Sequence, residues 1–142
     1  DEPFSGLDPV NSNLIKDEIF KLAQNGTTII FSTHRMEQVE EICDKIVLVN
    51  KGKKILDGSL KQIKDDFKEH LFKIGFDTLP EAIESNAFEI IGSKENAFTV
   101  KIIDGNKPAD VLQEFLNHKA DIISFNEVLP SLNEIFIKVA GV

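Results

Sequence analysis

In three places in the first half of the chain, apolar residues recur at the three- and four-residue spacing of an amphipathic helix. The longest of these stretches is 10–25, and its closing Asn25-Gly26 pair is typical of a helix end. The same spacing predicts a helix over 35–43 and another that runs to Phe67 with Ser59 as its N-cap. Each helix therefore has one face suited to packing against other elements.

Two short apolar runs between these helices predict strands. Residues 27–32 (TTIIFS) and 45–50 (KIVLVN) lack polar alternation, which is typical of strands buried on both faces of a sheet. Lys51-Gly52 predicts a tight turn from the second run into a hairpin strand over 53–56, which Asp57-Gly58 closes. This half of the chain therefore combines helices with strands of the buried type.

After about residue 69 apolar and polar residues alternate, as they do in half-exposed strands. The predicted strands are 72–76, 88–91, 98–102 and 121–127, and the predicted helices are 79–85, 108–118 and one that begins at Pro130. The order β-α-β-β-α-β plus a helix predicts a small ferredoxin-like α+β domain of the split βαβ type. We expect a boundary near residues 68–71, which gives one part over 1–68 and an accessory domain over 69–142.

The charge balance argues against a nucleic-acid partner. The 142 residues include 16 Lys and Arg against 24 Asp and Glu, a net charge of -8, without a basic stripe that could displace counterions from a phosphate backbone. Cys43 is the single cysteine, so no internal disulfide forms, and its apolar neighbours predict a buried structural thiol. No apolar run approaches the roughly 20 residues of a spanning helix, so we expect any membrane association to go through a partner.

Adjacent carboxylates open the chain at Asp1 and Glu2. Phosphoryl transfer to water needs a Mg²⁺ ion held by oxygen ligands and a group that orients or deprotonates the attacking water. Neighbouring carboxylates at a strand end are able to divide these two tasks. Taken alone, an acidic pair before Pro3 is more often a solvated turn, so the pair gains meaning only from the residues that follow.

Two further motifs follow the acidic pair. Ser5-Gly6-Leu7-Asp8 forms a flexible turn with an acidic end, and Asp8 with Pro9 is also suited to start a helix as a plain N-cap. His34 directly follows the predicted strand 27–32, so we expect it at the carboxyl end of that strand, where open α/β sheets bind ligands. A lone histidine there is more often structural. A phosphoryl-transfer site is therefore indicated only by the acidic pair, the Ser5–Asp8 turn and His34 taken together in this order.

The run D-E-P-x-S-G-L-D-P, followed about two dozen residues later by S-T-H, resembles the Walker B end, D-loop and H-loop of an ABC-transporter ATPase subunit. The resemblance covers residues 1–68 and implies the C-terminal part of an α/β P-loop NTPase domain. It makes Asp1 the aspartate that holds Mg²⁺, usually through water, and Glu2 the general base or water-polarising carboxylate. His34 would contact the γ-phosphate of ATP. The residues that would line the nucleotide dimer seam are Ser5, Gly6, Leu7 and Asp8.

In this family ATP sits between two head-to-tail subunits, one of which offers a Walker A loop and the other a signature sequence. Neither GxxxxGK[ST] nor LSGGQ occurs in the 142 residues. The chain therefore looks like the C-terminal portion of a longer protein, and we expect this piece alone to be inactive and to bind Mg-ATP feebly or not at all. Strands 27–32 and 45–50 would then expose apolar faces, which predicts a dimer, a swapped assembly or a disordered start.

Residues 69–142 resemble the C-terminal accessory domain of ABC ATPases of the drug- and ion-export type. The segment 130–136, P-S-L-N-E-I-F, is similar to the P-S-L-E-D-I-F ending common in those subunits. His70 and His118 are isolated and lack the spacing of a metal site. Small-molecule sensing, dimer stabilisation and regulation of the ATPase are all open as roles for this domain. Phenylalanines are expected to fill its core: Phe72, Phe98 and Phe125.

The leading hypothesis is the ATP-binding and ATP-hydrolysing subunit of an ABC transporter, which couples hydrolysis to export by a membrane-spanning partner subunit. It implies ATP and Mg²⁺ as cofactors, a second ATPase subunit in a homodimer, and a peripheral position on the cytoplasmic face of the cell membrane. The alternative is a stand-alone regulatory or dimerisation module with vestigial motifs. As an isolated fragment, the 142-residue chain is expected to be cytoplasmic.

Overall fold

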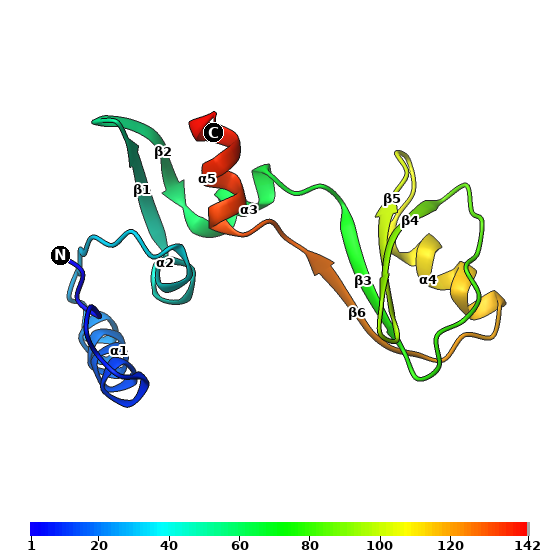
Figure 1. The fold of residues 1–142 in the computed structure, drawn as a ribbon, viewed down its shortest axis with the longest axis horizontal. Helices are drawn as coiled ribbons and strands as arrows, with labels where there is room; N and C mark the ends of the chain where they lie inside the picture. The colour runs from blue at the N-terminus through cyan, green and yellow to red at the C-terminus, as the bar shows by residue number, and fades with distance from the viewer. Residues whose placement is uncertain (142) are drawn as a thin grey trace. The chain divides into compact units, whose positions relative to one another are not determined.

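The computed structural model describes residues 1–141, which form two compact units (Figure 1). Unit 1 comprises Asp1–Ile63 together with the chain from Leu132 onward, and unit 2 comprises Lys64–Ser131. The last helix is therefore grouped with the first half of the chain, whereas the sequence placed it in the accessory domain that begins at residue 69. Each unit has its own helices and its own sheet.

The helices of unit 1 lie where the apolar spacing predicts them. Among the described residues they are α1 (Pro9–Gln24), α2 (Met36–Ile42) and α5 (Leu132–Ala140), and α3 (Leu60–Asp66) begins in unit 1 and ends in unit 2. α5 packs against α2 through a face that buries Leu132 and Ile135. The Glu40 carboxylate of α2 accepts a hydrogen bond from the Leu132 backbone N–H, so it satisfies one of the donors that the start of a helix leaves unpaired. Within residues 1–141, no helix combines the length and hydropathy that crossing a membrane requires.

β1 (Lys45–Asn50) and β2 (Lys53–Ser59) form an antiparallel hairpin in unit 1. The turn is Lys51-Gly52, as predicted, and both residues have positive φ, 49° and 73°. Two-residue hairpin turns favour this left-handed conformation because it matches the twist of the strands. The hairpin prediction is confirmed, although β2 continues beyond its predicted end at Leu56.

Apolar side chains are exposed on one face of β1 and along α1. Ile46 and Leu48 are buried, but Val47 and Val49 on the opposite face are 65% and 59% exposed. β1 has the apolar pattern of a strand buried on both faces, but in unit 1 the two-stranded hairpin is covered on one face only, so its other face is exposed, as expected for these residues. α1 has no buried residue at all. The apolar surface expected on this half of the chain is present.

Residues 27–32 do not form a strand, so this prediction is wrong. Ile30 in the middle of the segment is 92% exposed. Only the end of the segment is joined to the start of the chain, where the Ser32 carbonyl accepts a hydrogen bond from the Glu2 N–H at 2.7 Å. A strand requires a neighbour that offers a ladder of such bonds, and no other strand among residues 1–141 pairs with this segment.

Unit 2 is built on a four-stranded antiparallel sheet in the order β4-β5-β3-β6. Its elements are β3 (Leu71–Phe76), β4 (Phe88–Lys94), β5 (Ala97–Ile102), α4 (Pro108–Asn117) and β6 (Ile122–Val128). The long connections join β3 to β4 and β5 to β6, and in both cases another strand lies between the joined pair. This interleaving is the arrangement that a split βαβ fold requires. The prediction of mixed helices and antiparallel strands is confirmed.

The connection from β3 to β4 contains no helix, so the helix predicted over 79–85 is wrong and the ferredoxin-like fold is not complete. Leu79 and Ile83 still pack against the core of unit 2. The Ser85 hydroxyl accepts a hydrogen bond from the Ala87 N–H at 2.9 Å, a local bond that competes with helix formation. A seven-residue stretch also has few helical bonds with which to offset the cost of nucleation.

Phenylalanine rings fill the core of unit 2. Phe115 of α4 is 0% exposed, and its ring centroid lies 5.1 Å from that of Phe88 and 5.2 Å from that of Phe76. Phe72 stacks on Phe125 at 5.0 Å. Aromatic pairs at this range contribute about 0.5–1.5 kcal/mol each beyond their buried area. α4 is therefore held against the sheet largely by rings.

Candidate functional site

The start of the chain and the segment after α1 lie side by side in unit 1. The Glu2 N–H donates to the Ser32 carbonyl at 2.7 Å, and the Ser32 hydroxyl donates to the Asp1 carboxylate. His34 follows two residues later. The structure therefore brings Asp1, Glu2 and His34 together, although an extended segment rather than a strand leads to the histidine.

Both oxygens of the Glu2 carboxylate are held. Oε1 accepts from the His34 backbone N–H at 2.8 Å and lies 2.7 Å from His34 Nδ1, while Oε2 accepts from the Thr33 hydroxyl at 2.9 Å. The hydrogen bond from the His34 backbone is the main cause that lowers the pKa of Glu2; desolvation opposes it, and the imidazole and the Thr33 hydroxyl lower the pKa further. Glu2 is therefore ionised at neutral pH.

The Glu2 side chain is sheltered and that of His34 is open. Their side chains are 27% and 81% exposed. Because Nδ1 of the imidazole faces Glu2, Nε2 is the ring nitrogen left to meet a ligand. The backbone of Glu2 has φ of 45°, a region that non-glycine residues rarely occupy and that is often found at functional sites.

Asp1 has the donor chemistry of a magnesium ligand. Its carboxylate is exposed and engages the Ser32 hydroxyl through Oδ1. Mg²⁺ typically uses one or two protein carboxylates and takes its other ligands from water and substrate phosphates, so an exposed carboxylate beside Glu2 and His34 fits such an ion. Across residues 1–141, no three His, Cys, Asp or Glu side chains cluster as a complete metal site. An ion held by Asp1 would therefore need further ligands from water or substrate.

The four residues expected at a dimer seam form an exposed turn that leads into α1. The Ser5 N–H donates to the Glu2 carbonyl at 3.0 Å, which ties the turn to the acidic pair. Gly6 has φ of 75°, a left-handed conformation that glycine adopts without a steric penalty. The exposed residues are Ser5, Gly6, Leu7 and Asp8.

Asp8 is also the N-cap of α1, so the local structural role is present. Its Oδ1 accepts from the backbone N–H groups of Val10 at 2.9 Å and Asn11 at 3.0 Å, and its Oδ2 accepts from the Asn11 side-chain amide at 2.6 Å. These bonds, led by the one from the Asn11 backbone, lower the pKa of Asp8. Pro9 occupies the first turn of the helix, where its missing N–H costs nothing.

Two residues to which the sequence assigned no role also shape the site. Phe4 is 1% exposed, and its ring meets that of Phe31 edge-on with centroids 6.0 Å apart, so it anchors the turn to the segment before His34. Thr33 contacts the Glu2 carboxylate directly. The sequence signal for Phe4 is an aromatic residue directly before the small Ser5-Gly6 pair. The sequence signal for Thr33 is its hydroxyl directly beside His34.

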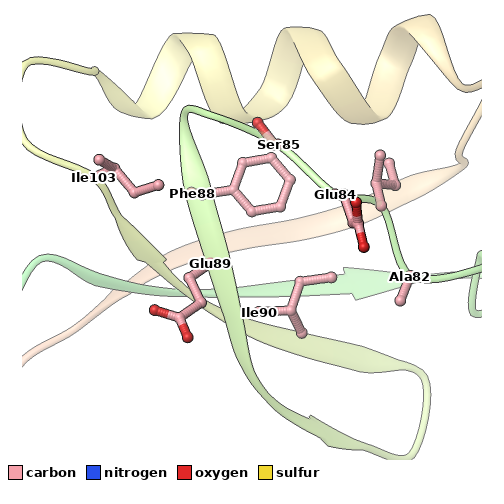
Figure 2. Close-up of a pocket in the computed structure, with 8 residues that line it drawn as sticks. Ala82, Glu84, Ser85, Phe88, Glu89, Ile90 and Ile103 are labelled. Atoms are coloured by element: carbon pink, nitrogen blue, oxygen red, sulfur yellow. The ribbon is translucent and has the colours of Figure 1, made fainter.

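A groove of about 510 Å³ lies in unit 2 along the edge of β4. Figure 2 shows Phe88 and Ile90 on one side of β4 and Glu89 on the other, with Glu84 on the connection beside the strand. The lining residues include two carboxylates but no histidine, cysteine, lysine or arginine. This groove therefore offers a phosphate no positively charged side chain, and its two carboxylates would repel one.

Comparison with known proteins places the sequence among ATP-binding proteins. Residues 58–140 match the family described as ATP-binding protein DrrA1-3-like, C-terminal domain. YhaQ of Bacillus subtilis, an uncharacterized ABC transporter ATP-binding protein, is 41% identical over 144 residues, which cover 99% of this chain and 47% of YhaQ. A fluoroquinolones export ATP-binding protein of Mycobacterium tuberculosis is 30% identical over 141 residues, which cover 99% of this chain and 42% of that protein.

The daunorubicin/doxorubicin resistance ATP-binding protein DrrA of Streptomyces peucetius is 24% identical over 149 residues, which cover 99% of this chain and 45% of DrrA. The chain spans about half the length of the curated relatives it matches. The matched family region begins within β2 and extends through unit 2 to the end of α5. The chain therefore belongs to the DrrA1-3-like family of ABC transporter ATP-binding proteins and carries its C-terminal domain.

Proposed function

We propose that this chain is part of the ATP-hydrolysing subunit of an ABC exporter, in which Asp1, Glu2 and His34 act on the terminal phosphate of ATP. The observation that carries the proposal is the contact between the Glu2 carboxylate and the His34 imidazole, 2.7 Å from Oε1 to Nδ1. This contact places the Glu2 carboxylate, which is able to take a proton, next to the His34 imidazole, which is able to bind a phosphate oxygen.

Glu2 is the proposed base. An ionised carboxylate is able to accept a hydrogen bond from the attacking water, orient that water and take its proton as the new bond to phosphorus forms. To do so, Glu2 exchanges one of its present hydrogen bonds for the bond to water. Mg²⁺, when bound with ATP, neutralises charge on the phosphates, and Asp1 is the residue proposed to hold it through water.

His34 is the proposed contact of the γ-phosphate. When Nδ1–H donates to Glu2, Nε2 carries a proton only in the imidazolium form. In that form Nε2–H would donate a hydrogen bond to a phosphate oxygen and stabilise the charge that develops there. Glu2 also fixes the orientation of the ring through Nδ1.

The proposed partners are a second ATPase subunit and a membrane-spanning subunit. The exposed turn Ser5-Gly6-Leu7-Asp8 would line the seam between two ATPase subunits on the cytoplasmic face of the membrane. The proposal of export is supported by relatives that are named for fluoroquinolones export and for daunorubicin/doxorubicin resistance.

Glu2→Gln in the full-length subunit tests the assignment of the base. The amide preserves the shape of the side chain but accepts no proton, so phosphate release should fall by roughly 100-fold or more, while ATP-induced dimerisation, measured by size-exclusion chromatography, persists. Glu37→Gln makes the same change at an exposed glutamate of α2 and should retain activity. Full turnover in Glu2→Gln would move the base elsewhere, with His34 the first candidate.

The 142-residue chain by itself is expected not to hydrolyse ATP, because its sequence contains neither GxxxxGK[ST] nor LSGGQ. Isothermal titration of Mg-ATP into this chain should give no binding in the micromolar range. Micromolar affinity would show that the phosphates find a cradle within these residues, contrary to the proposal.

A stand-alone dimerisation or regulatory module is the second candidate. The exposed apolar residues of α1 and β1, among them Val10 at 70% and Val47 at 65% exposure, favour association with another polypeptide. The natural open reading frame distinguishes the two candidates. A Walker A loop encoded upstream of Asp1 supports the ATPase, and a start codon at this position supports the module.

A further inference from the structure

One hydroxyl group connects the Glu2–His34 pair to the start of α2. Thr33 Oγ1 donates to Glu2 Oε2 at 2.9 Å and accepts from the Arg35 backbone N–H at 3.1 Å. Arg35 is the N-cap residue of α2. The Thr33 side chain is partly buried, so its hydroxyl is fixed on both sides rather than free to rotate in solvent.

This hydroxyl determines the plane of the Glu2 carboxylate. His34 holds Oε1 with two groups, its backbone N–H and its ring, and a carboxylate held at one oxygen is able to swing the other. The bond from Thr33 holds the second oxygen. A hydrogen bond to an ionised group is stronger than one between neutral groups. Because the carboxylate plane decides where a water molecule can bind in line with a phosphate, its position affects the rate of attack.

Gln38 provides the Thr33 hydroxyl with a second acceptor. Gln38 Oε1 lies 3.3 Å from Thr33 Oγ1, and a hydroxyl has a single proton to donate. Thr33 therefore bonds either to Glu2 or to Gln38. The bond to Glu2 is shorter, 2.9 Å, and its acceptor is ionised, so Glu2 is the preferred acceptor and Gln38 the competing one.

We infer that Thr33 is a positioning residue for the proposed hydrolysis. Its hydroxyl holds the Glu2 carboxylate in the plane in which Glu2 also engages His34, and it keeps this bond while the attacking water binds. The catalytic consequence rests on the proposed function, whereas the contact with Glu2 is testable by itself.

The contact is tested in the 142-residue chain by the NMR resonance of the His34 backbone amide proton, which a short hydrogen bond to a carboxylate shifts downfield. Glu2→Gln and Thr33→Val should both move this resonance upfield, and Thr33→Ser, which retains the hydroxyl, should not. Thr28→Val makes the same change at an exposed threonine and should leave it unchanged. If Glu2→Gln moves the resonance and both Thr33→Val and Thr33→Ala leave it in place, the inference is wrong.

The catalytic role is tested in the full-length subunit. Thr33→Val should lower kcat roughly tenfold, the order of one hydrogen bond to a charged group, with KM for ATP within about twofold of wild type, and Thr33→Ser should restore kcat. If Thr33 only stabilised the fold, Thr33→Val would not lower kcat selectively while leaving KM for ATP near its wild-type value. If Glu2→Gln is inactive and Thr33→Val keeps the wild-type kcat, the inference about Thr33 is wrong but the proposed function stands. Full activity in Glu2→Gln overturns the proposed function as well.

Discussion

His34 binds one carboxylate oxygen of Glu2 with both its backbone and its ring. The placement of the Glu2 side chain is therefore coupled to the path of the main chain at His34, and Phe4 reinforces that path by packing on Phe31. A few hydrogen bonds and one aromatic contact thus hold together residues that lie far apart in the sequence. Asp8 adds a local constraint, because its cap fixes the point at which the turn becomes α1.

Asp8→Asn should make the thermal stability of the chain less sensitive to acid. The pKa of Asp8 is lowered in the folded state, so its contribution to stability is complete above the unfolded pKa and is lost as the pH falls through the lower, folded value. Asparagine caps a helix about as well and does not titrate. Melting temperatures followed by circular dichroism should agree for the two proteins near neutral pH and diverge below about pH 4.

In the same measurement Asp8→Ala should melt a few degrees lower at neutral pH, because the cap is lost outright. A parallel decline of wild type and Asp8→Asn in acid would mean that the charge of Asp8 contributes nothing to the stability of the fold.

At the scale of elements, most helices and turns that depend on local sequence were predicted correctly, whereas a strand that depends on a paired neighbouring strand was not. The helices α1 to α5 follow from repeated apolar spacing, and the β1–β2 turn follows from Lys51-Gly52. Segments 27–32 and 79–85 were misassigned because a strand needs a paired neighbour, and because a short helix loses to local bonds such as that of Ser85. The bonds of Thr33 could not be predicted, since spatial proximity selects the partner of a hydroxyl.

A Cβ added at Gly75 of β3 would clash with Ser124 Oγ of β6. Gly75→Ala therefore requires the Ser124 hydroxyl to rotate away and should lower the free energy of unfolding by roughly 1 kcal/mol. Gly92→Ala is the matched control, since the nearest atom to a Cβ there is 3.8 Å away on Thr99. Chemical denaturation measures both changes.

Removing the Ser124 hydroxyl should relieve that clash. Gly75→Ala combined with Ser124→Ala is therefore expected to recover part of the lost free energy of unfolding. If the double variant is as unstable as Gly75→Ala, the glycine is required for a reason other than contact with Ser124.

At the scale of the whole molecule, the chain divides into two units, and its only predicted chemistry lies in the first. Unit 1 contains the carboxylates and the imidazole, and it also includes α5, which follows unit 2 in the sequence. The resemblance of its motifs to those of ABC ATPases predicted the site from the sequence. The matches over 99% of the chain support that family. The grouping of α5 with unit 1 was not predictable, because its amphipathic pattern does not identify the surface that it covers.

The most direct test of the account is a double-mutant cycle on ATP hydrolysis by the full-length subunit, with Glu2→Gln, His34→Ala and the two combined. If the carboxylate and the imidazole act together on the terminal phosphate, each single variant should lose most of the activity and the combined variant should lose little more. Losses that multiply, or a His34→Ala variant with wild-type turnover, would contradict the account.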